Sequence, residues 1–332
     1  MENSADTAGM IRCAVVGLGR IGSLLEADPL REKPCTHAGA IADNAECTLV
    51  GGCDIDPERR TLFAERWSVD AVYADLDELL QQTQPQILCV ATHPDSHRTC
   101  VEKAALHRVP VVVCEKPLAD TLRNARAIAR LHRKRCVTVV TNHERRYSVD
   151  YQQVRETIVD RRFGRLIAVR GTLCFGRNQR HDRVLLHDGT HMVDVINYLL
   201  QSSLKIRGRF GRMRSRRGSA FLYAVAGRVP VIIEVGSERD HLLFEIELSF
   251  ERGRIRVGNG VYAVEQSVES PYYEGYRSLQ PVDQLSIART GYFSGMLADA
   301  VACVRDPRRE PVSSARDGLA CMRFIVRAKS RL

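Results

Sequence analysis

The sequence predicts an α/β protein of two domains, in which a doubly wound parallel sheet is followed by an α+β domain with a large, mostly antiparallel sheet. The chain has 332 residues, and at roughly 100 to 200 residues per domain this length allows about two hydrophobic cores. Up to about residue 142, short apolar runs alternate with segments of helical length. From about Gly164, strand-like runs follow one another without regular helices between them.

The first domain, expected at 10–142, is predicted from a regular alternation of strands and helices. Residues 11–16 form a β-rich apolar run that ends on glycine, and further runs of this kind lie at 49–54, 86–92, 109–115 and 136–142. Helical patterns begin at about Ile21 and cover 57–66, 97–107 and 118–133. Strands that are apolar on both faces and alternate with helices are typical of a parallel sheet covered on both sides.

The second domain, expected at 143–332, is predicted to bind substrate and to support oligomerisation. Its strand-like runs lie at 166–175, 229–237, 242–250 and 253–258. Helical patterns cover 148–161 and about 190–200. A last helix, at about 314–330, is expected to pack back on the body of the protein.

Composition and charge exclude several classes of protein. Hydrophobic residues make up 44% and charged residues 27%, as in ordinary globular proteins. The first ten residues lack the features of a signal peptide, and no run approaches about 18 apolar residues, so we expect a cytoplasmic protein without a membrane partner. The eleven cysteines are scattered and form no CxxC pair. The net charge of +9 comes from arginines spread along the whole chain, which favours an anionic ligand over nucleic acid.

A glycine loop predicts dinucleotide binding. Gly17, Gly19 and Gly22 follow the first strand and precede a helical pattern. In a Rossmann domain the first glycine permits a tight turn, the second lets backbone amides approach a pyrophosphate, and the third allows close packing of the helix. The expected cofactor contacts of this loop are Gly17, Leu18, Gly19, Arg20, Ile21 and Gly22.

The acid at the end of the second strand favours NAD over NADP. Asp54 is placed to bind both ribose hydroxyls and to repel a 2′-phosphate, although the spacing is long because 26–36 resembles an insertion in the first helix region. Aspartate is also a common turn former, so Asp54 has a second interpretation as the start of a turn. Arg59 and Arg60 follow one turn later, and because arginine can bind a 2′-phosphate, NADP remains an alternative cofactor.

Five motifs resemble the Gfo/Idh/MocA family of oxidoreductases, and their order covers nearly the whole chain. They are GLGRIG (17–22), ATHPDSH (91–97), CEKPLA (114–119), NHERRY (142–147) and LLHDGTHMVD (185–194). The resemblance implies a Rossmann domain, a second domain whose sheet is often used for contacts in a homodimer or homotetramer, and NAD(P)-linked oxidation or reduction of a hydroxyl, commonly on a sugar or polyol.

Lys116 is the strongest catalytic candidate. It follows a parallel strand at the edge where Rossmann ligands bind, so its ammonium is expected to contact both the cofactor and the reacting oxygen of the substrate. The resemblance implies that the lysine of the EKP motif is catalytic and that its bond to Pro117 is frequently cis. Glu115 is expected to orient the lysine or a cofactor hydroxyl.

His191 is expected to exchange the hydroxyl proton and to contact substrate, because imidazole titrates near neutrality and the family keeps its catalytic histidine at this place. Many members carry an aspartate four residues earlier, where this chain has His187, with Asp188 next to it. Either His187 takes the polar role and binds substrate, or Asp188 reaches the site because the segment is not helical, or the reaction differs from simple alcohol oxidation. A metal site formed by His187, His191 and Asp194 is the less favoured interpretation, so no metal is expected.

Further contacts are expected around the crevice. His93 and Pro94 are predicted beside the nicotinamide ribose, although a strand-ending turn would also explain them, and Thr92 and His97, which starts the next helix, are further expected cofactor contacts. Arg145 and Arg177 are candidates for an acidic or phosphorylated substrate, and the same motifs offer Asn142, Arg146, Asn178, Arg180 and His181.

Three function classes remain open at this stage: a dehydrogenase or reductase, a glycoside hydrolase that uses bound NAD without net redox change, and a regulator that binds a dinucleotide without turnover. Substrate identity and reaction direction leave no readable motif in the sequence.

Overall fold

The computed structural model describes residues 9–282 and 290–330, which form two compact units. The first unit comprises the described residues up to Tyr147 together with Gly291–Met322. The second unit comprises Ser148–Thr290 and the described residues from Arg323 onward. The stretch 291–322 therefore groups with the first unit, although the sequence analysis assigned it to the second domain.

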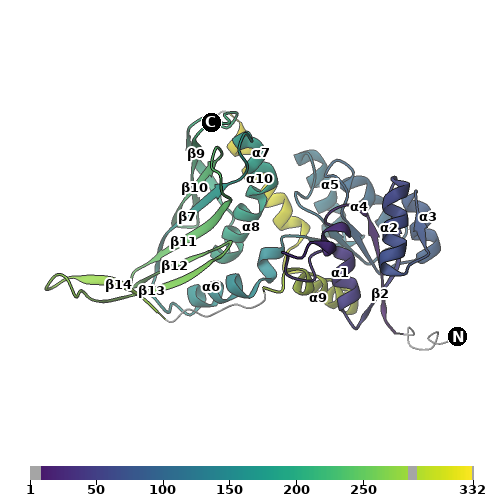
Figure 1. Cartoon of the computed structure of the whole chain (residues 1–332), viewed down its shortest axis with the longest axis horizontal. Coiled ribbons are helices and arrows are strands. Elements are labelled where there is room, and N and C mark those ends of the chain that lie inside the picture. Colours follow the sequence, from purple (N-terminus) through teal and green to yellow (C-terminus); the bar gives the residue numbers. More distant parts are fainter. Residues whose placement is uncertain (1–8, 283–289, 331–332) are drawn as a thin grey trace. The chain divides into compact units, whose positions relative to one another are not determined.

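The first unit is built on a parallel sheet of order β3-β2-β1-β4-β5-β6. Its strands are β1 (Ile11–Val16), β2 (Cys47–Cys53), β3 (Val72–Tyr73), β4 (Ile87–Val90), β5 (Val111–Cys114) and β6 (Thr138–Thr141). β4 and β5 are buried along their whole length, as the apolar runs predict, whereas β3 has two residues and no run long enough to reveal it. The helices α2 (Pro57–Trp67), α3 (Leu76–Thr83), α4 (His97–Leu106) and α5 (Leu122–Arg133) connect these strands, as Figure 1 shows.

Strand order places a topological switch point beside β1. The chain leaves β1 for β2 on one side and later returns to β4 on the other side, and both neighbours pair with β1 in parallel. Ligands of doubly wound folds bind at the carboxyl ends of the strands at such a point. The glycine loop after β1 and the segment after β4 both begin there.

The helix expected from about Ile21 is absent. The chain instead makes one wide turn, in which Ser23 and Leu24 donate backbone hydrogen bonds to the carbonyl of Gly19, and then a 3₁₀ helix, η1 (Leu24–Ala27). The regular helix α1 (His37–Asp43) begins only after the predicted insertion, where the Thr36 hydroxyl accepts a hydrogen bond from the Gly39 amide. The Glu26 carboxylate ties the insertion down by accepting from Thr36 Oγ1 at 2.7 Å and from the Cys35 amide at 3.1 Å.

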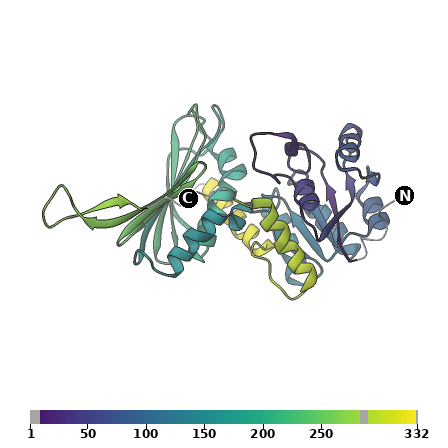
Figure 2. The same cartoon turned by 60° about the horizontal axis from the view of Figure 1, so that its bottom comes forward.

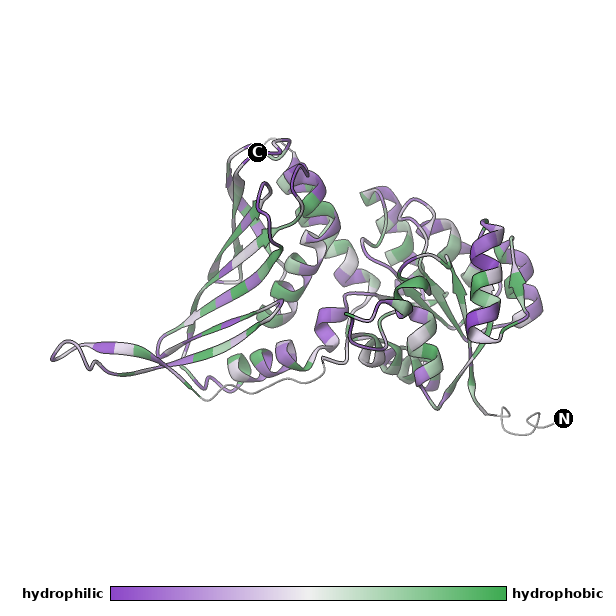
Figure 3. Cartoon of the chain, viewed as in Figure 1, coloured by the Kyte–Doolittle hydropathy of each residue, from purple (hydrophilic) through white to green (hydrophobic). Residues whose placement is uncertain are grey.

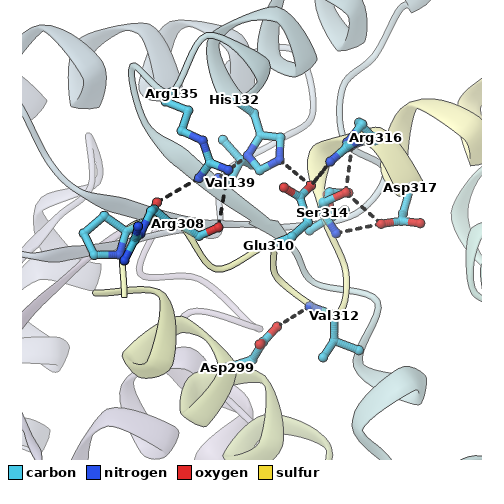
Figure 4. A network of polar contacts seen from close by, with 12 residues as sticks. His132, Arg135, Val139, Asp299, Arg308, Glu310, Val312, Ser314, Arg316 and Asp317 are labelled. Carbon is cyan, nitrogen blue, oxygen red and sulfur yellow. Dashed lines mark hydrogen bonds and ion pairs between the residues drawn. The ribbon is translucent and has the colours of Figure 1, made fainter. Parts of the chain in front are cut away.

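The stretch 291–322 belongs to the first unit because its helix α9 (Tyr292–Arg305) contacts α1, β4 and β5 and shares their hydrophobic core. A polar network holds the segment that follows α9 (Figure 4). His132 accepts from the Val139 amide through Nδ1, so its Nε2–H donates to Glu310, at 2.9 Å. Arg135 donates to the carbonyls of Pro307 and Arg308. The last helix, α10 (Ala315–Lys329), packs Gly318 against Leu118 and Thr141.

The second unit contains an eight-stranded sheet of order β14-β13-β12-β11-β7-β10-β9-β8, in which β7 and β10 are parallel and all other pairs are antiparallel. The strands are β7 (Leu166–Cys174), β8 (Lys205–Phe210), β9 (Ser219–Ala226), β10 (Val229–Gly236), β11 (Leu243–Phe250), β12 (Gly253–Gly258), β13 (Val261–Glu269) and β14 (Arg277–Pro281). The mostly antiparallel sheet expected from the sequence is confirmed.

Helices pack on one face of this sheet. They are α6 (Val149–Val159), α7 (His181–His187) and α8 (Gly189–Leu200), which contact β12, β10 and β7 respectively (Figures 1 and 2). Hydrophobic and hydrophilic residues alternate along several of the strands, as expected for a sheet with one covered face (Figure 3). None of the described helices combines the length and apolar character needed to cross a bilayer.

Candidate functional site

Two glycines of the loop are required by the packing of the protein itself. Gly17 has φ +88°, and a Cβ added there would lie 2.6 Å from the backbone carbon of Ala91, at the end of β4. A Cβ on Gly22 would overlap the carbonyl oxygen of Gly17. Each contact is closer than real Cβ atoms approach, so only glycine fits without a shift of the backbone.

Gly19 is different, because its surroundings leave room for a side chain. The nearest atom to an added Cβ is an Nη of Arg59 at 3.5 Å, which is an ordinary van der Waals contact. Internal packing therefore does not explain this glycine. A pyrophosphate that must approach the backbone closely does explain it, so the loop fits the group that the motif implies.

Asp54 connects the end of β2 to the glycine loop. One carboxylate oxygen accepts from the Leu18 amide at 2.8 Å, and the other accepts from the Asp56 amide at 3.0 Å. The turn-forming role expected for Asp54 is therefore present, and its contact with a ribose stays a prediction. Arg59 lies 3.6 Å from the same carboxylate, whereas Arg60 donates to the carbonyl of Asp54 at 2.7 Å.

Glu115 is the centre of a buried polar cluster at the end of β5. Its carboxylate accepts from the Asn142 amide group at 2.6 Å and from the Lys116 backbone amide at 3.1 Å, and His37 Nε2 lies 3.0 Å away. His37 comes from α1, after the insertion, and is fully buried. Sequence reasoning missed His37, because a single histidine after a variable segment carries no readable motif.

The charges in this cluster favour an ion pair between the carboxylate of Glu115 and the imidazolium of His37. Burial by itself would raise the pKa of Glu115, but the hydrogen bond and positive charge of His37, with Lys116 and Asn142, lower it. Burial likewise disfavours a charged His37, yet its neighbours Cys89 and Glu115 raise the pKa of the imidazole to about 10. A carboxylate held in place in this way can orient the backbone of Lys116.

Lys116 itself is half-buried and follows β5, and its bond to Pro117 is cis, as the resemblance implied. His97 lies between the loop that carries Lys116 and the loop that follows β4. Its Nδ1 lies 3.3 Å from the carbonyl of Leu118 and its Nε2 lies 3.1 Å from the carbonyl of Thr92. Burial lowers the pKa of His97, and a neutral imidazole has a single N–H, so the ring donates to one of these two carbonyls and packs against the other. His93 is exposed, and Thr92 Oγ1 accepts from Ser96 at 2.8 Å.

The two arginines of the NHERRY motif differ in their surroundings. Arg146 is buried and donates to the Val312 carbonyl at 2.6 Å, and it pairs with Asp317 at 3.0 Å, so its role is to hold the segment after α9. Arg145 is half-buried, with its guanidinium 6.0 Å from the ring centre of Tyr292.

In the second unit, the segment that carries His187 and His191 is not one continuous helix. α7 ends at His187, α8 begins at Gly189, and Asp188 lies between them with φ −101° and ψ −29°. Asp188 keeps helical dihedrals, and its amide donates to the Val184 carbonyl at 2.9 Å, whereas the His191 amide donates to the Asp188 carbonyl, so the two helices meet at a tightened turn. Which of His187 and Asp188 takes the place of the family's aspartate stays a prediction.

His187 and Asp188 both line a cavity of about 540 Å³ within the second unit. Its other lining residues are Phe175, Gly176, Gln179, Arg183, Val184 and Leu242. Arg177 belongs to the same loop and is exposed but does not line this cavity. Arg180 pairs with Asp182 at 2.5 Å, and His181 is fully buried, so neither is the pocket residue that the sequence suggested. His191 is half-buried near the start of α8, and Asp194 is buried one turn later.

Comparison with known proteins finds a family model that matches the N-terminal part of the first unit. The model of an oxidoreductase family with an NAD-binding Rossmann fold, Gfo/Idh/MocA, matches residues 11–143. The D-apiose dehydrogenase of Paraburkholderia graminis is 27% identical over 188 residues, which are 54% of this chain and 49% of that protein. The inositol 2-dehydrogenase of Salmonella typhimurium is 25% identical over 200 residues, which are 59% of this chain and 56% of that protein. The chain thus spans about half the length of these curated relatives.

Solved structures share the fold over almost the whole chain. An oxidoreductase from Agrobacterium radiobacter, solved with NAD⁺, L-tartaric acid and magnesium, has a TM-score of 0.71 at 18% identity and covers 96% of both chains. An aldose-aldose oxidoreductase from Caulobacter crescentus, solved with glycerol, has a TM-score of 0.75 at 17% identity, with 96% of this chain and 97% of that chain covered. At these identities the likeness is one of fold.

Proposed function

We propose, from the premise that residues 11–143 belong to the Gfo/Idh/MocA family of NAD-binding oxidoreductases, that the protein is an NAD(P)-dependent dehydrogenase or reductase. Its proposed substrate is a small molecule with a hydroxyl or ketone, sugar- or polyol-like in character. The observation that carries the proposal is the space at Gly19, beside an Asp54 carboxylate that already binds the Leu18 amide.

The loop after β1 would hold the pyrophosphate, through the backbone of residues 17–22, and Asp54 would take the adenosine ribose. A buried aspartate at that place favours NAD over NADP, because its side chain opposes a 2′-phosphate. Arg59 is the residue that opposes this preference, since its guanidinium lies 3.6 Å from Asp54. Thr92, His93 and Lys116 follow β4 and β5 at the same edge of the sheet and are the proposed contacts on the nicotinamide side, with His97 holding the loops that carry them.

When bound, the nicotinamide supplies a two-electron acceptor or donor for the carbon that carries the reacting oxygen. The residues of the chain handle the proton and the orientation. We assign Lys116 to the reacting oxygen, through its ammonium group, and His191 to the transfer of the hydroxyl proton. Glu115 is a positioning residue, because its carboxylate holds the Lys116 amide at 3.1 Å.

The substrate contacts in the second unit are proposed around the cavity of about 540 Å³. This volume lies in the range of small-molecule sites. His187, Asp188 and Arg183 supply its polar groups and Phe175 and Leu242 its apolar ones, a mixture that suits a hydroxylated ring. Arg145 and Arg177 remain proposed contacts for an anionic substituent.

The uncovered face of the second sheet is proposed to join copies of a cytoplasmic homodimer or homotetramer. Tyr223 and Ile232 are paired in register on β9 and β10, and they are 44% and 37% exposed. Light scattering on the wild type and on Tyr223→Arg tests this proposal, with loss of the oligomer expected for the variant. A wild-type monomer would refute it.

Turnover is tested with a panel of sugars, polyols and sugar acids, followed at the reduced-nicotinamide absorbance, for the wild type and for Lys116→Ala. The variant should lose at least about 100-fold in kcat and keep its dinucleotide Kd, since general acid–base groups contribute about 10²- to 10⁴-fold. Lys134→Ala is the matched control, because Lys134 is exposed at the end of α5. Full activity of Lys116→Ala would overturn the assignment. Sugar release without a change in absorbance would instead indicate the redox-neutral hydrolase.

A further inference from the structure

A second cavity, of about 760 Å³, lies in the second unit where the end of β8 meets the carboxyl end of α10. Four of its seven lining residues are cationic, and none is acidic or aromatic. The lining consists of Arg209, Gly211, Arg212, Met213, Arg214, Lys329 and Ser330. The arginines are spread along the sequence, but the fold gathers Arg209, Arg212 and Arg214 around one cavity. Lys329, from a distant part of the chain, adds a fourth cation.

Within the part of the chain that the structure describes, no carboxylate neutralises the positive charge of this cavity. Over residues 9–282 and 290–330, no carboxylate forms an ion pair with Arg212, Arg214 or Lys329. Arg209 donates to the carbonyls of Ala328 and Ser330, at 3.0 and 3.1 Å, which fixes its side chain against the end of α10 without cancelling its charge. Like charges held close together repel, so an anion in the cavity would relieve an unfavourable interaction.

The basic loop, residues 211–218, contacts a fully buried histidine at both of its ends. The two ring nitrogens of His181 lie 3.1 Å from the carbonyls of Arg212 and Gly218, at opposite ends of the loop. The first two residues of α7 add backbone bonds, from His181 to the Ser215 carbonyl and from Asp182 to the Met213 carbonyl at 2.7 Å. Because the backbone of this loop is already ordered, binding of a ligand has to order only the side chains of Arg212 and Arg214.

The segment that follows β10 also forms hydrogen bonds with the basic loop. Ser237 Oγ donates to the Arg216 carbonyl at 2.5 Å, and the Gly218 amide donates to the Glu238 carboxylate at 2.8 Å. Gly211, with φ +90°, makes the bend that turns the chain from β8 into the loop.

We propose that this cavity binds a compact small molecule carrying several phosphate groups, at a site separate from the dinucleotide loop of the first unit. Three or four uncompensated cations call for a multivalent anion, and guanidinium groups match phosphate oxygens through paired hydrogen bonds. The cavity volume suits one small ligand. Single-stranded nucleic acid is disfavoured because its grooves use aromatic side chains for base stacking, and no aromatic residue lines this cavity.

The test is calorimetric titration of the full-length protein with inorganic tripolyphosphate at constant ionic strength. Arg212→Gln/Arg214→Gln should weaken binding at least about 100-fold, since each lost guanidinium removes a charge-assisted contact that contributes about tenfold or more. The matched control is Arg216→Gln/Arg217→Gln, which removes the same charge from the same loop but from residues that do not line the cavity. This control should bind within about threefold of the wild type.

Two further variants test the proposed site independently of the double loop variant. Lys329→Gln comes from a different element and should weaken binding about tenfold even if the double loop variant fails to fold. Gly19→Ala, in the first unit, should bind tripolyphosphate as the wild type does. The proposal is overturned if the wild type does not bind, if the control pair weakens binding as much as the lining pair, or if Gly19→Ala abolishes it. Binding of a single-stranded RNA oligomer more tightly than tripolyphosphate, with a steep salt dependence, would overturn it in favour of nucleic acid.

Discussion

Replacing the loop glycines by alanine one at a time should separate a role in folding from a role in binding. At Gly17 the left-handed φ of +88° costs an alanine about 1–2 kcal/mol, and its Cβ would also press against the backbone of Ala91 at 2.6 Å. Overpacking of this kind costs about 1–3 kcal/mol more, which gives about 2–5 kcal/mol in total. At Gly22 overlap with the Gly17 carbonyl gives about 1–3 kcal/mol.

Gly19→Ala should behave in the opposite way. Its Cβ meets Arg59 at an ordinary 3.5 Å, so the free energy of unfolding should stay within about 0.5 kcal/mol of the wild type. The added methyl group would occupy the surface that a pyrophosphate must approach. Loss of one or two charge-assisted hydrogen bonds should then weaken dinucleotide binding about 10- to 100-fold.

Thermal unfolding and fluorescence titration with NADH measure the two effects on the same samples. At roughly 2–4 °C per kcal/mol, Gly17→Ala should lower Tm by about 5–20 °C, and Gly19→Ala should leave it almost unchanged. The reasoning is refuted if Gly19→Ala binds NADH as tightly as the wild type. It is equally refuted if Gly22→Ala is as stable as the wild type, because the contact that demands glycine would then be unimportant.

Three other perturbations test the surroundings of the site. Asp54→Asn keeps an acceptor for the Leu18 amide but removes the negative charge, so the ratio of NADP to NAD affinity should rise at least about fivefold; an unchanged ratio would show that the carboxylate does not select the cofactor. Phe63→Ala, at 1% exposure on α2 against Gly52 of β2, should destabilise the protein by about 3–5 kcal/mol in urea unfolding, against less than about 1 kcal/mol for its exposed neighbour Leu62→Ala. The raised pKa of His37 means that the contribution of this histidine to the free energy of unfolding is complete below about pH 6.5 and is lost as the pH rises towards 10. The lowered pKa of Glu115 means that the contribution of this carboxylate is lost as the pH falls below about 4.5. His37→Gln should therefore flatten the alkaline decline in urea midpoints, and a decline as steep as in the wild type would remove His37 as its source.

The strands and the loop motifs could be predicted because their causes are local. A strand buried on both faces needs an apolar run, and β1, β4 and β5 have one. Gly17 and Gly22 are visible in the sequence because a tight turn has no other good solution at these positions. The cis bond at Pro117 followed from the EKP motif.

Other features could not be predicted from local patterns. The helical pattern at Ile21 is overridden by a wide turn on the carbonyl of Gly19, and α1 begins only at His37, after the insertion. Spacing on an ideal helix placed His187 and His191 on one face, but the chain breaks at Asp188. Arg146 resembled a ligand residue and instead holds the Val312 carbonyl, 166 residues away.

By itself the sequence determined the fold class and the glycine loop, because periodicity and glycine geometry act over a few residues, whereas the catalytic candidates came from motifs that resemble a known family and stay predictions. The tertiary structure decided which charges meet. It brought His37 to Glu115 across 78 residues, and it gathered Arg209, Arg212 and Arg214 with Lys329 around one cavity. Electrostatic interaction depends on distance through space rather than along the chain, so neither cluster could be read from spacing.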